Sequence, residues 1–212
     1  MRKTLQIVLL FIVVLTACNS KNNYIIPTDF SLLIPDSTQI SNGITVKQQE
    51  KRSAEFFNTL RANTINHEIP EATIFDLKGK SQNLKEKLTD KKIIIFTSLT
   101  CAWNMTGLLN DFPKANQYVE NPIHQNEIIL LILKENNDYF HQQFERNIEE
   151  IKRNYSNIYL VDSIQSLKLN MFGLSRYYIS KHHIVLDIGM GTATKEGYLE
   201  NEIRKNTVAN SK

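Results

Sequence analysis

The sequence has few of the residues from which disulfide frameworks and metal centres are built. It contains 212 residues but only two cysteines, Cys18 and Cys101, which excludes a disulfide-rich scaffold. Zinc takes four thiolate or imidazole ligands, and the five histidines share no helical or strand spacing that would supply them. We therefore expect no metal ion and no other cofactor.

An excess of charge of one sign is also absent. The chain carries 25 Lys and Arg against 22 Asp and Glu, a formal net charge of +3. Nucleic-acid binding depends on a concentration of positive charge, so we expect no nucleic-acid partner. Hydrophobic residues make up 42% of the sequence, which is enough to bury the core of one globular domain.

Residues 1–17 have the composition of a secretory signal. Arg2 and Lys3 precede an apolar stretch over residues 5–15, which is too short to cross a bilayer comfortably. The sequence Leu-Thr-Ala-Cys that ends at Cys18 resembles the bacterial lipobox. This resemblance implies that acyl chains such as palmitate are attached to Cys18 and that the mature protein begins there, held at a membrane. The alternative is an ordinary signal peptide, or an uncleaved anchor, in which Cys18 is incidental.

Cleavage before Cys18 would remove two basic residues and no acidic one, which lowers the net charge to +1 and leaves about 195 residues. The resemblance to bacterial lipoproteins implies a location in the cell envelope, outside the cytoplasm. Asn19 follows the lipid cysteine in place of an aspartate retention signal, which favours the periplasmic side of an outer membrane. Cys101 would then be the one free thiol in a compartment that is usually oxidising.

The mature chain divides into two parts by composition. Residues 18–66 begin polar and rich in turns, and they are expected to form a tether and an N-terminal extension with a helix over 47–62. Residues 67–212 are expected to form the compact domain. The residues expected on the apolar face of the first helix are Ala54, Phe57 and Leu60.

Within the domain, strand and helix patterns alternate. Continuous apolar runs over 92–98 and 127–133 predict strands that are buried on both faces of a sheet. Gly79 predicts the turn of a preceding β-hairpin, and Pro113 is expected to kink or split the helix that begins at Cys101. The other expected elements are helices over 138–155, 163–172 and 194–207 and strands over 157–161, 176–180 and 184–188. This alternation predicts an α/β sandwich with a mixed central sheet.

Three stretches carry a resemblance to a known family. In order between residues 68 and 207, they are IPEATIFDLKGKSQNLKEKLTDKKIIIFTSLTCAW, LVDSIQSLKLNMFGL and YYISKHHIV. Together they resemble the TlpA-like and AhpC/TSA branch of the thioredoxin-like superfamily. The resemblance implies a thioredoxin-like three-layer sandwich with an N-terminal β-hairpin. It also implies that Cys101 occupies the place of the family's attacking thiol.

Two functional positions depart from the family pattern. Asn104 stands where the thiol/disulfide reductases have the second, resolving cysteine of a C-x-x-C motif. The stretch Leu174-Ser175-Arg176 stands where a proline in the cis form normally shapes the peptide groove. Cys101 can therefore attack a disulfide, but an external thiol has to release it. The residues expected beside the substrate are Trp103, Asn104 and Ser175.

Three functions fit these residues. The first is single-cysteine thiol/disulfide exchange at Cys101 with a partner protein or an external thiol reductant. The second is a one-cysteine peroxidase, for which the family resemblance implies that Ser98 and Arg176 activate the thiolate and bind peroxide. The third is a redox-silent binding or scaffold module in which Cys101 only packs, because a free cysteine is often buried as a small apolar residue.

Overall fold

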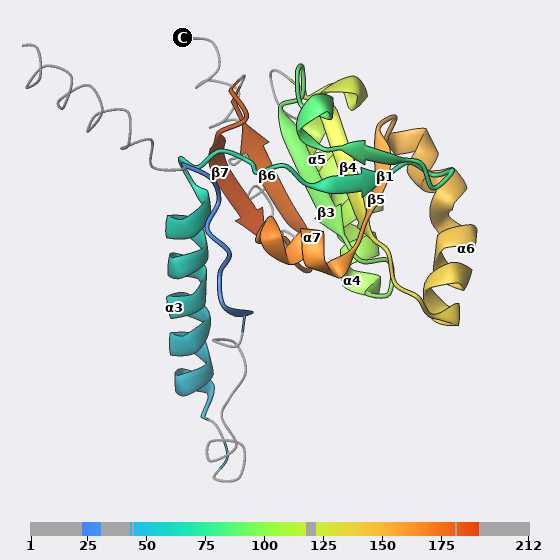
Figure 1. Cartoon of the computed structure of the whole chain (residues 1–212). Helices are drawn as coiled ribbons and strands as arrows, with labels where there is room; N and C mark the ends of the chain where they lie inside the picture. The colour runs from blue at the N-terminus through green and yellow to red at the C-terminus, as the bar shows by residue number, and fades with distance from the viewer. Residues whose placement is uncertain (1–22, 31–42, 44, 118–121, 181, 191–212) are drawn as a thin grey trace, which may run out of the picture.

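The computed structural model describes the greater part of the chain between residues 23 and 190, over residues 23–30, 43, 45–117, 122–180 and 182–190. The described residues are built around one central sheet (Figure 1). The expected signal peptide over 1–17, the lipid site at Cys18 and the expected last helix over 194–207 lie outside these residues.

Seven strands make up the sheet. They are β1 (Thr73–Phe75), β2 (Ser81–Asn83), β3 (Ile93–Thr97), β4 (Ile128–Leu133), β5 (Ile158–Val161), β6 (Ser175–Ile179) and β7 (Val185–Met190). Their order across the sheet is β2-β1-β5-β4-β3-β6-β7. β3, β4 and β5 are parallel, whereas β6 and β7 on one side and β1 and β2 on the other form antiparallel pairs. Because parallel neighbours need crossover connections, helices link β3 to β4 and β4 to β5.

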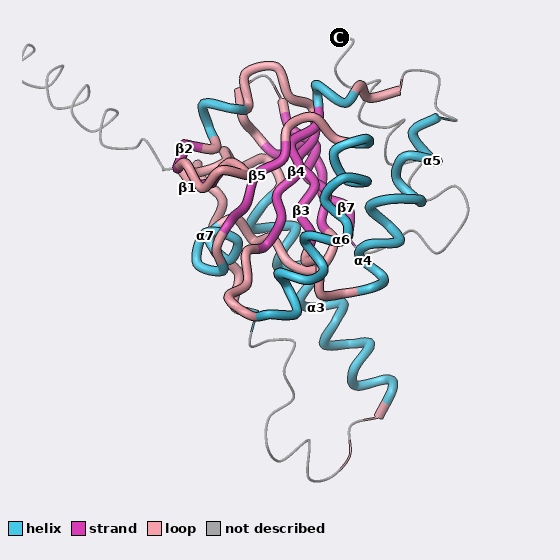
Figure 2. The backbone as a smooth tube through the Cα atoms, turned by 90° about the vertical axis from the view of Figure 1, so that its right-hand side faces the viewer, coloured by secondary structure: helices cyan, strands magenta, loops and turns pink. Residues whose placement is uncertain are grey.

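Helices form the two outer layers. They are α3 (Val46–Thr64), α4 (Ala102–Thr106), α5 (Phe112–Gln117), α6 (Asp138–Asn154) and α7 (Ser163–Lys168), with the 3-10 turns η2 (Lys85–Lys87) and η4 (Gln125–Glu127) and the π turn η3 (Gly107–Asp111). α4, α5 and α6 cover one face of the sheet, and α3 and α7 lie on the other (Figure 2).

Both faces of the sheet are packed, and β3 shows this most clearly. Ile94 and Phe96 belong to the core under α3, while Ile93 and Ile95 belong to the core under α4 and α6. Side chains alternate along a strand, so a strand buried on both faces has to be apolar on both. The apolar run over 92–98 predicted this pattern.

The expected fold class is confirmed. The described residues form an α/β sandwich of three layers, with a mixed central sheet and an N-terminal β-hairpin. The order of strands and helices from the hairpin to β7 is the order that the sequence predicted.

The β1–β2 hairpin turns at the position that Gly79 predicted. Gly79 has a φ of 83°, which residues with a side chain rarely adopt. The Asp76 carboxylate accepts hydrogen bonds from the backbone N–H groups of Lys80 and Lys78, both at 2.9 Å. These bonds, that from Lys80 above all, hold the pKa of Asp76 below its ordinary value, because they stabilise the charged form.

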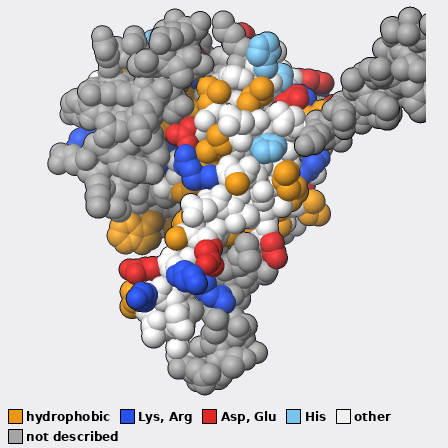
Figure 3. Space-filling view, turned by 90° about the vertical axis from the view of Figure 1, so that its left-hand side faces the viewer, with side chains coloured by type: hydrophobic (Ala, Val, Ile, Leu, Met, Phe, Trp, Pro, Cys, Tyr) orange, Lys and Arg blue, Asp and Glu red, His pale blue; other side chains and the backbone are white. Residues whose placement is uncertain are grey.

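The helix expected over 47–62 is present as α3, but its expected buried face is wrong in two places. Phe56, Leu60 and Thr64 are the buried residues, whereas Ala54 is exposed and Phe57 is 36% exposed. Residues four apart form one row along a helix, and Phe56, Leu60 and Thr64 are such a row. The outward surface of α3 mixes basic and acidic side chains (Figure 3).

Residues 23–30 are packed onto the rest of the protein. Ile25 is 5% exposed and belongs to the core under α3. The N–H of Ile25 donates to the carbonyl of Glu68, and the N–H of Ile26 donates to the carbonyl of Asn63, both at 3.0 Å. The described part of the expected N-terminal extension therefore shares one core with the sheet. The domain boundary between residues 66 and 67 stays a prediction.

Asn170 joins this segment to its surroundings. Its side chain is fully buried, its φ is 56°, and its Oδ1 accepts a hydrogen bond from the N–H of Thr28 at 2.7 Å. Its Nδ2 donates to the carbonyl of Ile26 at 2.9 Å and to Oγ1 of Thr64 at 3.0 Å. The Tyr177 hydroxyl donates to the backbone carbonyl of Asn170 at 2.7 Å. One residue thus connects the N-terminal segment, α3 and β6.

We expect Asn170→Gly to lower the free energy of unfolding by about 2–3 kcal/mol, because it removes three hydrogen bonds and leaves the Thr28 N–H without its acceptor. Glycine adopts positive φ freely, so backbone strain does not add to this loss. Urea denaturation measures the change. Asn66→Gly is the matched control, since Asn66 also has a positive φ, of 65°, but is exposed; we expect a change below about 0.5 kcal/mol. Equal losses in the two variants would contradict this role of the Asn170 side chain.

Candidate functional site

Cys101 lies where the chain emerges from the buried sheet. Every residue of β3 is buried, and Leu99 beyond it is 1% exposed. Cys101 is partly exposed and is the N-cap residue of α4, with an extended backbone at φ −109° and ψ 114°. The thiol therefore stands between a rigid strand and the first turn of a helix.

Pro113 was expected to kink or split the helix that begins at Cys101, but the chain stays helical from Ala102 to Gln117 and only its α-helical hydrogen bonding is interrupted. The interruption takes the form of the π turn η3, in which the N–H of Phe112 donates to the carbonyl of Gly107. Pro113 follows as the second residue of α5, and the carbonyl five residues before it, that of Leu108, accepts a hydrogen bond from the Tyr155 hydroxyl. The chain thus accommodates the proline directly after the π turn, at the start of the second short α-helical piece.

A hydrogen-bonded group of side chains holds the loop that leads to Cys101. Oε1 of Glu135 lies 2.8 Å from the Ser98 hydroxyl and 3.0 Å from the Thr100 hydroxyl, and both hydroxyls donate to it. The two hydroxyl oxygens are 2.7 Å apart. Ser98 follows β3 and Glu135 follows β4, so the group joins the carboxyl ends of two parallel strands. We call Ser98, Thr100 and Glu135 the loop cluster.

The loop cluster is also connected to α6. Nδ2 of Asn137 donates to Oε2 of Glu135 at 3.1 Å. Oδ1 of Asn137 accepts from the N–H of Phe140 at 2.7 Å and so caps the first turn of α6. The position of the Cys101 loop therefore depends on the start of the neighbouring helix.

The sequence predicted Ser98 as a site residue but not Thr100 or Glu135. The Ser98 hydroxyl was expected to assist the thiolate, whereas here it donates to Glu135. A signal for Glu135 is present in the sequence, because it lies two residues after a buried parallel strand. Polar residues at that position meet at the carboxyl edge of a parallel sheet.

The three residues expected beside the substrate have different surroundings. Trp103 is 72% exposed, so its ring is available to a partner. Asn104 is 8% exposed in the first turn of α4. Ser175 is fully buried, and its hydroxyl donates to the carbonyl of Phe172 at 3.0 Å. Burial of Asn104 and Ser175 argues against direct contact with a substrate, since both lie inside the protein surface.

Arg176 lies inside the protein, on the face of the sheet that α4 and α6 cover. It is 1% exposed, and its Cα is paired with that of Ile95 in β3, so the two side chains share one face. Burial raises the pKa of the Tyr155 phenol, and the positive charge of Arg176 opposes this shift. The Tyr155 hydroxyl donates to the carbonyl of Leu108 in the π turn at 2.6 Å. Arg176 thus belongs to the layer beneath the helical run that begins at Cys101.

Within the ranges that the structure describes, no three His, Cys, Asp or Glu residues are grouped so as to hold a metal ion. No helix in those ranges combines the length and the apolar character that crossing a bilayer requires.

Comparisons with known proteins give likenesses of structure alone. No protein-family model matches the sequence, and no curated protein matches it. The thioredoxin domain of a thiol-disulfide oxidoreductase from Bacteroides vulgatus is similar at 15% identity and a TM-score of 0.46, over 67% of this chain and 96% of that chain. A thiol:disulfide interchange protein from Bacteroides sp. has the same identity and TM-score, over 67% and 89% of the two chains. A thiol peroxidase from Chromobacterium violaceum is similar at 10% identity and a TM-score of 0.47, over 70% and 88%. These likenesses assign no role to any residue of this chain.

We expect Glu135→Ala to loosen the loop before Cys101, because the hydroxyls of Ser98 and Thr100 and the Asn137 amide lose their shared acceptor. The free energy of unfolding should fall by about 1–3 kcal/mol, and the backbone amide of Thr100 should exchange its hydrogen faster. Urea denaturation and hydrogen exchange measure these effects. Glu145→Ala, which removes an exposed carboxylate from α6, is the matched control. If the two variants behave alike, the loop cluster does not hold the loop.

Proposed function

We propose that this protein carries out single-cysteine thiol/disulfide exchange outside the cytoplasm, with Cys101 as the nucleophile. The observation that carries the proposal is the position of Cys101, which is partly exposed and lies between the buried end of β3 and the first turn of α4. Backbone N–H groups of a first helical turn favour a negative charge beside them, and the thiolate is the reactive form of cysteine.

The exchange has three chemical steps. The Cys101 thiolate attacks one sulfur of a partner's disulfide, so that a mixed disulfide forms and the other sulfur leaves as a thiolate. An external thiolate then attacks the Cys101 sulfur and releases the partner in its reduced form. A second external thiolate restores Cys101 and leaves as one half of a disulfide with the first. Two electrons thus pass from two external thiols to the partner, since Asn104 provides no internal thiol.

The surface near Cys101 suits a protein as the partner. Trp103, Tyr139 and Ile164 are 72%, 54% and 72% exposed, although large apolar side chains are usually covered. They lie in the first turns of α4, α6 and α7, which follow the parallel strands β3, β4 and β5. The carboxyl ends of parallel strands meet at one edge, so these side chains and Cys101 share that edge of the sheet. Exposed apolar side chains at the edge that carries Cys101 support a peptide or protein disulfide as the substrate over a small polar one.

The proposal includes the anchor at Cys18. Acyl chains on that residue would hold the protein at a membrane of the bacterial envelope, with the domain on the extracytoplasmic side. The lipobox-like sequence before Cys18 supports this part of the proposal. Mass spectrometry of the protein isolated from membranes tests it directly.

The thiol is tested in the chain from residue 18 with Cys18→Ser, so that Cys101 is the one cysteine present. We expect folded protein to react with an aromatic disulfide reagent without prior denaturation, because the Cys101 thiol is partly exposed. Stopped-flow absorbance measures the rate. The variant that also carries Cys101→Ser is the control and should release no chromophore.

Two results would contradict this expectation. A thiol that reacts only after denaturation would favour the redox-silent binding module. Peroxide consumption that is fast and is lost in Arg176→Lys as well as in Cys101→Ser would favour the one-cysteine peroxidase, the second candidate. Burial of Arg176 on the sheet face that α4 covers is the observation that keeps the peroxidase open.

Asn104→Cys tests whether the surroundings of Cys101 support dithiol chemistry. A cysteine there restores the C-x-x-C spacing across the first turn of α4. We expect an internal disulfide with Cys101, seen as protection of both thiols from alkylation after mild oxidation, and at least tenfold faster catalysed reduction of a protein disulfide. Asn104→Ser, which changes the side chain without adding a thiol, should give neither effect. Failure to form the internal disulfide would contradict the assignment of Cys101 to the attacking position.

A further inference from the structure

The N-terminal segment and Cys101 lie at opposite ends of the sheet. In Figure 1 the blue segment begins near the upper end of α3, whereas α4 lies at the lower end of the sheet. Cys101 follows β3 beyond Thr97, at the carboxyl edge of the parallel strands. The N-terminal segment lies at the other end of β3, its amino end.

Hydrogen bonds fix that location. β6 runs antiparallel to β3, and the N–H of Ile179 at the end of β6 donates to the carbonyl of Lys92 just before β3, at 3.0 Å. The turn between β6 and β7 therefore lies at the amino end of β3. Glu68 forms bridges with Ile184 in that turn and with Tyr24 in the N-terminal segment. Residues 23 and 24 are thus held at the amino edge of the parallel strands.

The distance from this point to the expected lipid is short. Five residue steps separate Cys18 from Asn23, and a fully extended chain covers at most about 18 Å in that number. β3 and β4 are five and six residues long, which is about 16–20 Å at 3.3 Å per residue. A lipid on Cys18 therefore lies beside the amino edge in most courses of this short chain, and it reaches the carboxyl edge only if the chain is fully extended along the sheet.

We propose that the amino edge of the parallel strands is a membrane-facing surface, and that Cys101 and Trp103 are directed away from the bilayer. The occupant of the surface is the lipid bilayer itself, in the leaflet that holds the acyl chains of Cys18. This inference rests on the anchor in the proposed function, and it adds which face of the domain meets the lipid.

The charges of the two edges agree with this orientation. Described residues of the amino edge, over 84–92, 122–127 and 152–157 together with 65–68, contain six basic and four acidic residues. Described residues of the carboxyl edge, over 98–106, 134–139 and 162–166, contain one basic and three acidic residues. Basic side chains are attracted to anionic headgroups within about a Debye length, whereas the carboxyl edge would be repelled.

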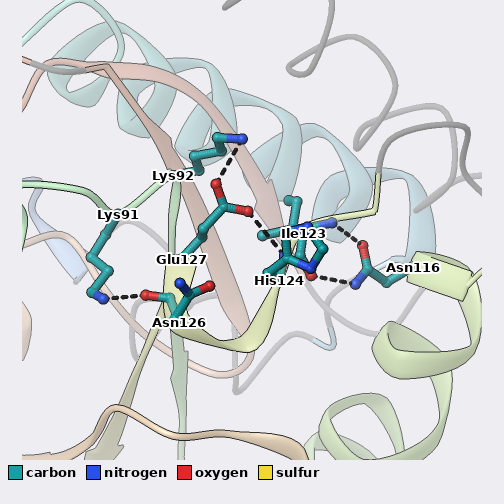
Figure 4. A network of polar contacts seen from close by, with 7 residues as sticks. All are labelled: Lys91, Lys92, Asn116, Ile123, His124, Asn126 and Glu127. Carbon is teal, nitrogen blue, oxygen red and sulfur yellow. Dashed lines mark hydrogen bonds and ion pairs between the residues drawn. The ribbon is translucent and has the colours of Figure 1, made fainter.

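The amino edge is also rigid enough to define an orientation. Glu127 accepts from Lys92 at 2.7 Å and from the N–H of His124 at 3.0 Å (Figure 4). Asn116 binds both backbone groups of Ile123, at 2.7 and 2.9 Å, and so ties α5 to the loop before β4.

A second ion pair connects the same edge to the N-terminal segment. Lys85 pairs with Glu68, and its Nζ lies 5.1 Å from the ring centroid of Tyr24. The hydrogen bond from Lys85 to Glu68 raises the pKa of Lys85, because it stabilises the charged form of the amine. The segment that leads to the lipid is therefore bound to the edge by side chains as well as by backbone.

The test uses the one tryptophan of the sequence, Trp103. The full chain is isolated from membranes, its acylation at Cys18 is verified by mass, and it is reconstituted into phosphatidylglycerol and phosphatidylcholine vesicles with brominated acyl chains. Bromine quenches tryptophan only in close contact, so we expect Trp103 fluorescence to change by less than about a tenth.

Trp103→Phe combined with His182→Trp moves the tryptophan to the exposed β6–β7 turn, and we expect at least half of its fluorescence to be lost. Trp103→Phe with Asp90→Trp, before β3, is a second reporter should the first fail to fold.

The outcomes separate the orientation from the anchor. Acylated protein in which Trp103 is quenched as strongly as the tryptophan at residue 182 or 90 would overturn the orientation and leave the anchor in place. Protein that carries no acyl chain and does not float with the vesicles would overturn the anchor, and the orientation with it. Quenching at residue 182 or 90 without quenching at Trp103 supports both.

Discussion

A strand buried on both faces can meet solvent only at its two ends, and β3 is such a strand. Helices cover the Ile94 side and the Ile95 side alike, so no residue between 93 and 97 is available for function. Whatever β3 contributes to binding therefore has to lie at one of its two ends. Cys101 lies at one edge, and the chain that comes from Cys18 is bound at the opposite edge. The separation of these two positions follows from the course of β3 between them and from the bridges of Glu68, which hold the N-terminal segment at the amino edge.

Asn170 makes it possible to bury an N-terminal segment that has no regular secondary structure. Buried backbone groups need hydrogen-bond partners, and residues 23–30 have no continuous strand beside them but only the backbone of Glu68 and Asn63. An amide side chain both accepts and donates, so Asn170 can satisfy an N–H and a carbonyl of the same segment. Asparagine is also the side chain that tolerates positive φ best, which explains how one residue meets both needs.

The sequence was sufficient for the sheet and insufficient for the polar contacts. Apolar runs predict β3 and β4, because a strand that is buried on both faces of the sheet has to be apolar on both. Gly79 predicts the hairpin turn, because few residues other than glycine adopt its positive φ. The buried face of α3 was wrong because Phe56 and Phe57 are equally apolar, and only the position of the sheet distinguishes them. Glu135 was missed since its partners, Ser98 and Thr100, are 37 and 35 residues away and share no period with it. Periodicity records which face is buried, whereas a hydrogen bond between neighbouring strands depends on their register.

The π turn after Cys101 has a consequence for how this helical run is aligned. A π turn contains one residue more than an α turn, so the side chains after it are rotated by about 100° relative to those before it. The directions of Trp103 and Asn104 are set in the piece before the turn, while Phe112 packs in the core from the piece after it. The two pieces can therefore be aligned separately: the first follows the loop at the end of β3, and the second follows the packing under the sheet. A chain that lost one residue from Gly107–Asp111 would lose this wider turn, and the alignment of Cys101 would then be tied to that of the core.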